Sequence, residues 1–163
     1  MFYYFRGPKE GEGSTFTVYI PQAEAEKVAS LTKPVTAVVS GMGETILLAN
    51  DDSNLLGVQQ QLLETFGYKV LAAEDGLQAV ELFTAHQHDI ALFITDLMMP
   101  KLGGAEAAKM IQEINPRMKI IFLTSHIDYI KQMQDLALDA VVMHQPCGVV
   151  DFSRTIRKQL DKV

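Results

Sequence analysis

The side chains best suited to chemistry in this sequence are carboxylates, hydroxyls and amides, and each follows an apolar run of strand length. Asn50, Asp51 and Asp52 follow the first run, and Asp96 follows the third. The polar residues at the ends of the fourth and fifth runs are Thr124, Ser125 and Gln145. Neighbouring carboxylates repel each other unless a cation lies between them, and hard oxygen ligands suit Mg²⁺. A carboxylate beside a bound divalent ion can attack phosphorus as a nucleophile and become an aspartyl phosphate.

Five apolar runs predict the strands that would position these side chains. In chain order they are Ile46 to Ala49, Lys69 to Ala72, Ile90 to Thr95, Ile120 to Thr124 and Ala140 to Met143. The segments between and after the runs have a helical period. Five strands alternating with five helices predict an α/β fold, a doubly wound five-stranded parallel sheet with helices on both faces. Right-handed crossovers then put the functional crevice at the carboxyl ends of the strands.

The first helical segment has the clearest period. Leu55, Val58, Leu62 and Phe66 advance by three, four and four residues and form one apolar stripe, the pattern of a helix face that packs on a core. Apolar residues at helical spacing predict the other four helices, around Ala79 to Phe83, Ala108 to Ile114, Ile127 to Met133 and Val149 to Leu160.

Residues 44 to 163 resemble a response-regulator receiver domain of the bacterial two-component type. The matching motif is Asp-x-x-Met-Pro from Asp96 to Pro100, followed by Gly104. The acidic cluster after the first strand, the Thr-Ser pair after the fourth and a residue before Pro146 after the fifth complete the pattern. The resemblance implies a flavodoxin-like sheet with the strand order 2-1-3-4-5.

The resemblance also assigns roles to individual residues. It implies that Asp96 is the phosphoacceptor, and that Asp51, Asp96 and the backbone carbonyl of Met98 bind Mg²⁺. Thr124 would be the switch hydroxyl, and the residues next to the phosphoryl group would be Ser125 and Gln145. Asp52 falls where receivers usually carry a further acid, so a metal role and capping of the first helix both stay open for it.

Three residues depart from the receiver pattern. Asn50 stands where the family normally has the first of two paired acids, so the metal pocket has one negative charge fewer. Gln145 replaces the lysine that normally pairs with the phosphoryl group. Val142 occupies the position often held by a Tyr or Phe that moves inward on activation. These three departures leave the fold assignment intact, but they weaken the expectation of strong phosphorylation and of the usual signal readout.

Residues 1 to 22 resemble the end of a histidine-kinase ATP-binding domain, with residues 23 to 43 as a linker. The similarity lies in the Gly-x-Gly-Ser-Thr-Phe box from Gly11 to Phe16 and in the strand that ends at Ile20 and Pro21. The other boxes of that domain are absent, so we expect no ATP binding. We expect the strand over 14 to 20, without its native neighbours, to be disordered or to pair with another chain.

Two functions follow from these residues. The first is a phosphoacceptor receiver of a two-component phosphorelay, with a histidine kinase or phosphotransfer protein as its partner. The second is a pseudo-receiver, a protein-interaction module that needs no phosphate. An enzyme is not expected, because aspartate-nucleophile hydrolases usually need a second acid two residues after the nucleophile, and Met98 stands there.

Composition excludes several other functions. The net charge of −6 and the pI near 5.1 disfavour a nucleic-acid partner, since phosphate binding requires a basic surface. A single cysteine indicates a reducing compartment, and no apolar run is long enough to cross a membrane, so we expect a cytoplasmic location. Because no sequence follows the fifth predicted helix, we expect no output domain. The oligomeric state stays open and includes a homodimer.

Overall fold

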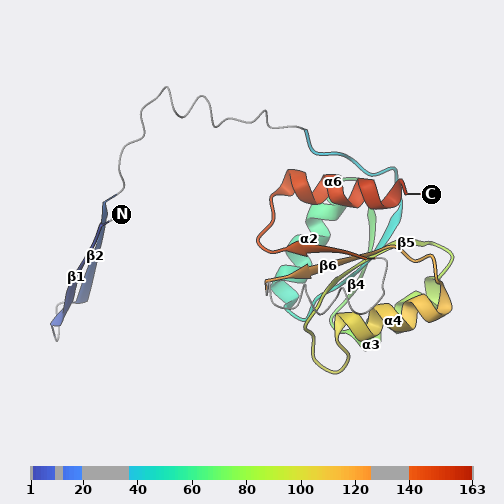
Figure 1. Ribbon diagram of the computed structural model, residues 1–163, viewed down its shortest axis with the longest axis horizontal. Coiled ribbons are helices and arrows are strands. Elements are labelled where there is room, and N and C mark those ends of the chain that lie inside the picture. Colours follow the sequence, from blue (N-terminus) through green and yellow to red (C-terminus); the bar gives the residue numbers. More distant parts are fainter. Residues whose placement is uncertain (1, 10–12, 20–36, 126–139, 163) are drawn as a thin grey trace. The chain divides into compact units, whose positions relative to one another are not determined.

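The computed structural model describes residues 2–9, 13–19, 37–125 and 140–162 (Figure 1). The chain divides into two units, Met1–Val35 and Thr36–Val163. None of the helices in the described ranges is both long and apolar enough to span a bilayer.

The first unit contains an antiparallel hairpin of β1 (Phe2–Lys9) and β2 (Gly13–Tyr19). Tyr3 lies opposite Val18 and Phe5 opposite Phe16, and the register shifts between Arg6 and Lys9. The expectation that this strand is disordered or pairs with another chain is therefore wrong. No strand was predicted over Phe2–Lys9, although Phe and Tyr are strong strand formers.

The second unit is built on a five-stranded parallel sheet in the order β4-β3-β5-β6-β7. The strands are β3 (Thr45–Ala49), β4 (Lys69–Ala73), β5 (Ile90–Asp96), β6 (Ile120–Thr124) and β7 (Ala140–His144). Counted within this unit, the order is 2-1-3-4-5, which confirms the predicted flavodoxin-like topology. One boundary matters for function, because Asp96 is the last residue of β5 and not the first residue after it.

Helices cover both faces of this sheet (Figure 1). Helices α2 (Ser53–Thr65) and α6 (Val149–Leu160) lie on one face, and α3 (Gly76–His86) and α4 (Gly104–Ile114) lie on the other. The helix predicted around Ile127 to Met133 lies outside the described residues.

Alternate residues of the strands fill two separate cores. In β3, Ile46 and Leu48 face the α2 and α6 side, where they join Leu63 and Ile156. Leu47 and Ala49 face the α3 and α4 side, where fully buried Phe83, Phe93 and Phe122 gather. Burial of each such phenylalanine contributes about 1.5–3 kcal/mol. Because both faces are buried, the strands read as continuous apolar runs.

The apolar stripe predicted for the first helix coincides only in part with its buried face, because Phe66 is buried and Leu62 packs against the core but Val58 does not. The buried residues of α2 are Leu56, Gln59 and Leu63, whereas Val58 is 63% exposed. Helix α2 is rotated so that Leu56 and Leu63, two turns apart, meet the sheet. The stripe at Leu55, Val58 and Leu62 instead forms one wall of a surface groove.

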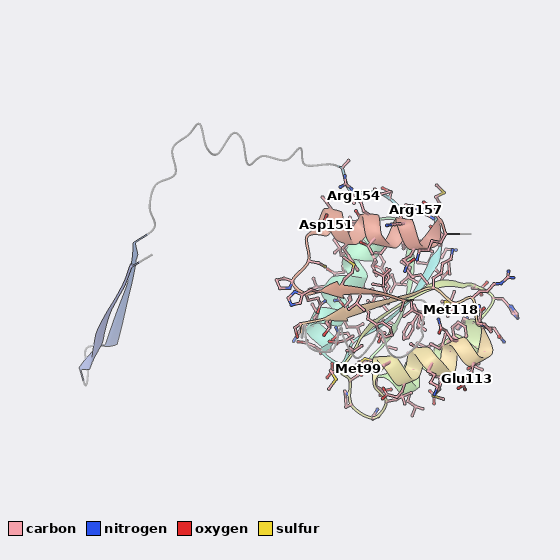
Figure 2. The ribbon with its side chains drawn as sticks, viewed as in Figure 1. Met99, Glu113, Met118, Asp151, Arg154 and Arg157 are labelled. Atoms are coloured by element: carbon pink, nitrogen blue, oxygen red, sulfur yellow. The ribbon has the colours of Figure 1, made fainter. Side chains whose placement is uncertain are left out.

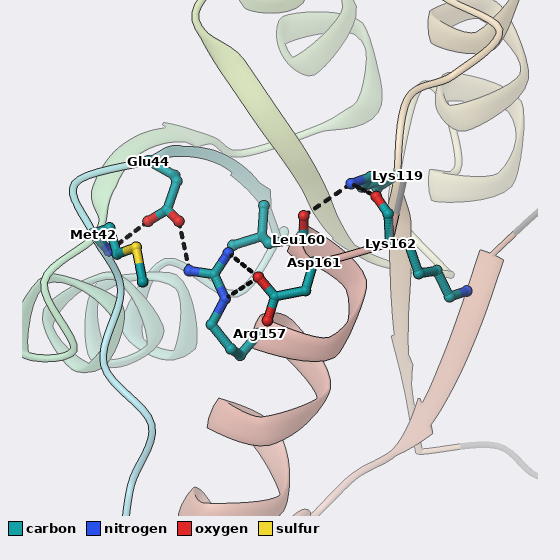
Figure 3. Close-up of polar contacts among 7 residues, drawn as sticks. All are labelled: Met42, Glu44, Lys119, Arg157, Leu160, Asp161 and Lys162. Carbon is teal, nitrogen blue, oxygen red and sulfur yellow. Dashed lines mark hydrogen bonds and ion pairs between the residues drawn. The ribbon is translucent and has the colours of Figure 1, made fainter.

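A polar network closes the amino edge of the sheet (Figure 3). Arg157 of α6 contacts Glu44 at 2.5 Å and Asp161 at 2.9 Å, and Glu44 also accepts a hydrogen bond from the Met42 amide at 2.6 Å. Burial by itself raises the pKa of Glu44, but the hydrogen bonds from Arg157 and the backbone outweigh it, so the pKa lies below its usual value. The residues just before Glu44 also pack against the second unit. The Val39 amide donates to Ser153 Oγ at 3.2 Å, and the Gly41 amide donates to the Phe66 carbonyl at 2.7 Å.

The Glu44–Arg157 pair predicts a pH-dependent contribution to stability. A carboxyl whose pKa is lowered by folding stabilises the protein above its unfolded pKa, about 4.3, and loses that contribution as the pH falls through the folded pKa. We expect Glu44→Gln to lower the free energy of unfolding by about 1 kcal/mol at pH 7. The difference should shrink toward zero in acid, measured by urea unfolding at a series of pH values.

Glu113→Gln is the matched control, because Glu113 is an exposed glutamate on α4 (Figure 2). It should leave stability unchanged at every pH. A Glu44→Gln deficit that stays constant down to pH 3 would show that the charge of Glu44 is not its cause.

Candidate functional site

The parallel register brings the candidate carboxylate, hydroxyl and amide residues to one edge of the sheet. Ala49 of β3 pairs with Thr95 of β5, and Asp96 pairs with Leu123 of β6. Since parallel strands run in the same direction, the residues that follow these pairs emerge together at the carboxyl edge. This edge holds the residues singled out from the sequence: Asn50, Asp51, Asp52, Asp96, Met98, Thr124, Ser125 and Gln145.

Asp96 is half-buried at this edge, and the backbone around it is tightly constrained. Its Oδ1 accepts a hydrogen bond from the Met98 amide at 3.2 Å, and its carbonyl accepts one from Thr95 Oγ1 at 2.8 Å. A Cβ atom at position 104 would lie 1.9 Å from the same carbonyl oxygen, so only glycine fits there. The glycine that belongs to the sequence motif is therefore required by the close approach of α4 to the end of β5.

Asn50 is 1% exposed, and its amide has a fixed orientation. Its Oδ1 accepts a hydrogen bond from the Asp52 amide at 2.9 Å. A backbone N–H can only donate, so Oδ1 must face it and Nδ2 must point the other way. Nδ2 is buried and has no hydrogen-bond partner within the described part of the chain. Asn50 thus contributes a donor where a carboxylate would contribute a negative charge.

Asp52 caps helix α2. Its Oδ1 accepts from the amides of Asn54 at 2.9 Å and Leu55 at 3.1 Å, which satisfies two donors of the first turn. Of the two roles left open for Asp52, capping is the one for which the structure gives contacts. Asp51, between Asn50 and Asp52, is exposed.

The oxygen atoms at this edge that could bind Mg²⁺ are few and carry little negative charge. Within the described ranges, no three His, Cys, Asp or Glu side chains are grouped to hold a metal ion. Mg²⁺ does not require such a cage, because it usually keeps several waters and binds through one or two carboxylates and phosphate oxygens. The residues that could hold Mg²⁺ here are Asp51, Asp96 and, through its carbonyl, exposed Met98, with the charge of one acid missing at Asn50.

The other side of the site is formed by β6 and β7. Thr124 is 1% exposed at the end of β6, and its carbonyl accepts a hydrogen bond from the Gln145 amide at 2.8 Å. The Gln145 side chain is half-buried and Ser125 is exposed. Val142 is partly buried against the core on the α3 and α4 side. The residue that follows β7 therefore has the neutral side chain of Gln145, whereas the receiver pattern has a positively charged lysine at this position.

An apolar groove of about 430 Å³ adjoins this end of the sheet. It lies between α2 and the start of α6, and it is lined by Leu55, Val58, Gln59, Leu62, Leu123, Ser125, Gln145, Pro146, Cys147, Val149 and Phe152. Burial raises the pKa of the Cys147 thiol, which therefore stays protonated at neutral pH.

One ion pair near the site was not predicted from the sequence. Lys101, in the loop after β5, contacts Asp75, which caps α3. The hydrogen bond from Lys101 lowers the pKa of the Asp75 carboxyl below its usual value. An Asp-Gly pair before an apolar helix does indicate a cap. Its partner 26 residues away has no local signal in the sequence.

Comparisons with known proteins agree with this geometry. Residues 46–144 match the family described as the response regulator receiver domain. The response regulator receiver protein CpdR of Brucella abortus is 33% identical over 116 residues, which cover 71% of this chain and 95% of CpdR. The sensor kinase CckA of the same organism is 24% identical over 161 residues, which cover 93% of this chain but 17% of CckA.

A solved structure gives the same result. The response regulator protein TrrA of Thermotoga maritima, crystallised in complex with Mg²⁺-BeF, has a TM-score of 0.65 and 26% identity to this chain. The match covers 71% of this chain and 98% of TrrA. The sheet order, the residues at its carboxyl edge and the family match over residues 46–144 lead to one conclusion: the chain belongs to the response regulator receiver domain family.

Proposed function

We propose that this chain accepts a phosphoryl group on Asp96, with Mg²⁺ bound, from a histidine of a kinase or phosphotransfer protein. The observation that supports this most directly is the position of Asp96. It is the last residue of the middle strand, it is half-buried, and the ends of β3 and β6 lie on either side of it.

As a receiver domain, the chain is not a catalytic enzyme by itself. In the proposed reaction, a carboxylate oxygen of Asp96 attacks the phosphorus of a phosphohistidine. A P–O bond forms as the P–N bond breaks, and the electron pair of that bond stays on the imidazole nitrogen, which takes up a proton. The hydroxyl of Thr124 and the amide of Gln145 would then donate hydrogen bonds to the phosphoryl oxygens.

The metal would be held by Asp51, Asp96 and the Met98 carbonyl. When bound, Mg²⁺ would reduce the repulsion between the attacking carboxylate and the phosphoryl oxygens. The protein's own part is to hold Asp96 in place, through the Met98 amide and the close contact with Gly104. The crystal structure of TrrA with Mg²⁺-BeF supports a metal role in a related protein.

We also propose that residues 1–22 are the C-terminal part of a kinase ATP-binding domain, joined by a linker over residues 23–43 to the receiver. The alignment with the sensor kinase CckA supports this, because it covers 93% of the chain and so extends beyond the receiver. The similarity to a sensor kinase also supports a histidine-containing protein of a two-component system as the partner.

The phosphoacceptor proposal is tested by incubating the protein with Mg²⁺ and a small phosphodonor, followed by intact-mass spectrometry. We expect one phosphoryl adduct on the wild type and none on Asp96→Ala. Labelling should be weaker than in receivers with a lysine at position 145, since a charge-assisted hydrogen bond is roughly twice as strong as a neutral one.

The alternative, a pseudo-receiver that binds a protein partner without phosphate, is favoured by the uncharged Asn50 and Gln145. The double variant Asn50→Asp with Gln145→Lys restores both charges and separates the two functions. If neither the wild type nor this variant takes up phosphate, the phosphoacceptor proposal fails and the pseudo-receiver remains.

A second prediction concerns the charge at Asn50. Asn50→Asp should bind Mg²⁺ roughly tenfold more tightly, because one more carboxylate faces the ion. Without metal, the same variant should unfold at a lower temperature, since a buried carboxylate beside Asp96 is neither solvated nor paired. NMR titration and thermal unfolding measure the two effects.

Asn115→Asp is the control for this variant. Asn115 lies at the end of α4, near the start of β6 and away from the site, and its Oδ1 accepts the Arg117 amide as a carboxylate would. It should change neither Mg²⁺ affinity nor metal-free stability. Equal tightening by both variants would mean that net charge, and not position 50, governs the affinity.

The proposed boundary at residue 22 is tested by deletion. Removal of residues 1–22 should leave the thermal unfolding of the receiver unchanged. Removal of residues 1–43 should lower the free energy of unfolding by about 4 kcal/mol, because the hydrogen bonds donated by the amides of Val39, Gly41, Met42 and Gly43 are lost at about 1 kcal/mol each. A large loss in the shorter deletion would contradict the proposed boundary.

A further inference from the structure

We propose that Lys101 and Asp75 form a positioning pair that holds the loop between β5 and α4 in place and thereby sets the affinity of the site for Mg²⁺. The inference rests on the proposed function, because it concerns the same metal site. Neither residue belongs to the proposed ligand set, and both act through the loop that carries Met98.

Backbone hydrogen bonds hold the loop between β5 and α4 at its base and near its tip. The Gly104 amide donates to the Leu97 carbonyl at 3.1 Å, which closes the loop at its base. At its far end, the Gly76 amide at the start of α3 donates to the Leu102 carbonyl at 3.1 Å. A Cβ atom at position 76 would lie 2.3 Å from that carbonyl oxygen, so the loop and the helix start touch with no space for a side chain.

The ion pair adds a charged contact at the far end of the loop. Lys101 has a φ of +64°, the only positive φ outside glycine in the described part of the chain. This left-handed conformation is unfavourable for a residue with a Cβ atom, so surrounding contacts must hold it. The contact that the structure gives for its side chain is the one to Asp75.

Asp75 is a fixed anchor for this contact. It is 6% exposed, and its Oδ1 accepts the Gln78 amide at 2.8 Å as the cap of α3, while Oδ2 faces Lys101. A shift of Asp75 would uncap the helix, so the exposed lysine is the partner that is held. The loop is thereby tied to a helix that is itself packed on the sheet.

The consequence for the site follows from the position of Met98, three residues before Lys101. Its carbonyl is a proposed metal ligand, and its amide donates to Asp96 Oδ1 at 3.2 Å. Mg²⁺ requires nearly ideal octahedral geometry, so a loop already in place binds it with less loss of freedom. With one carboxylate fewer at Asn50, the placement of the remaining ligands matters more.

The test compares Lys101→Met with Lys101→Arg by NMR. Loss of the pair in Lys101→Met should weaken Mg²⁺ binding about twofold to fivefold, the range for an ion pair with an exposed partner. Amide exchange at Gly76 and Gly104 in the metal-free protein should accelerate by a similar factor. Lys101→Arg keeps the charge, so its Mg²⁺ affinity and its amide exchange rates should equal those of the wild type. Asp75→Asn keeps a capping side chain and should resemble Lys101→Met, and the two changes together should add little.

Lys109→Met, an exposed lysine of α4, is the matched control and should change neither value. Unchanged exchange in Lys101→Met overturns the proposal whether or not the protein binds metal. Faster exchange with unchanged Mg²⁺ affinity shows a structural pair only and also overturns it. If the wild type binds no Mg²⁺ but exchange accelerates, the proposed function fails together with the metal part of this proposal, and the positioning of the loop stands.

Discussion

The parallel pairing of β3, β5 and β6 is the constraint on which the site depends. Because Ala49 pairs with Thr95 and Asp96 with Leu123, the strands end side by side. A shift of one residue in any of these pairings would turn Asp96 toward the other face of the sheet. Burial on both faces makes such a shift costly, since the two cores take alternate residues of the same strands. The packing of the whole unit therefore determines where one carboxylate points.

The two edges of this sheet differ in their polar contacts. At the amino edge, Arg157 contacts two carboxylates, and Lys119 donates to the carbonyls of Leu160 and Lys162 (Figure 3). At the carboxyl edge, neutral amides occupy the positions of Asn50 and Gln145. The ionic contacts of Arg157 therefore lie at the edge opposite Asn50 and Gln145, and substitutions at those two residues leave the ionic contacts intact.

The apolar runs and turn residues are local signals, and they predicted the parallel sheet and the edge where the polar residues meet, whereas the strand order came from the resemblance to receiver domains. The sequence did not predict how α2 is rotated. Of the predicted stripe, Phe66 is buried and Val58 is exposed, and the helix residues that are most deeply buried include Leu56 and Leu63, which the stripe left out. Two overlapping stripes fit one helix, and only the shape of the sheet decides between them. The hairpin partner of β2 and the Lys101–Asp75 pair were missed for a related reason, since both depend on contacts between separate segments.

The three residues that precede α2 have different contacts, and this difference bears on which of them can change in evolution. Asn50 and Asp52 both accept backbone hydrogen bonds that shape the turn and start the helix. Asp51 stands between them, exposed, and takes no part in those bonds. Selection on the proposed metal site can therefore act through Asp51 with little effect on folding, whereas changes at its two neighbours are constrained by the turn and helix start that they support.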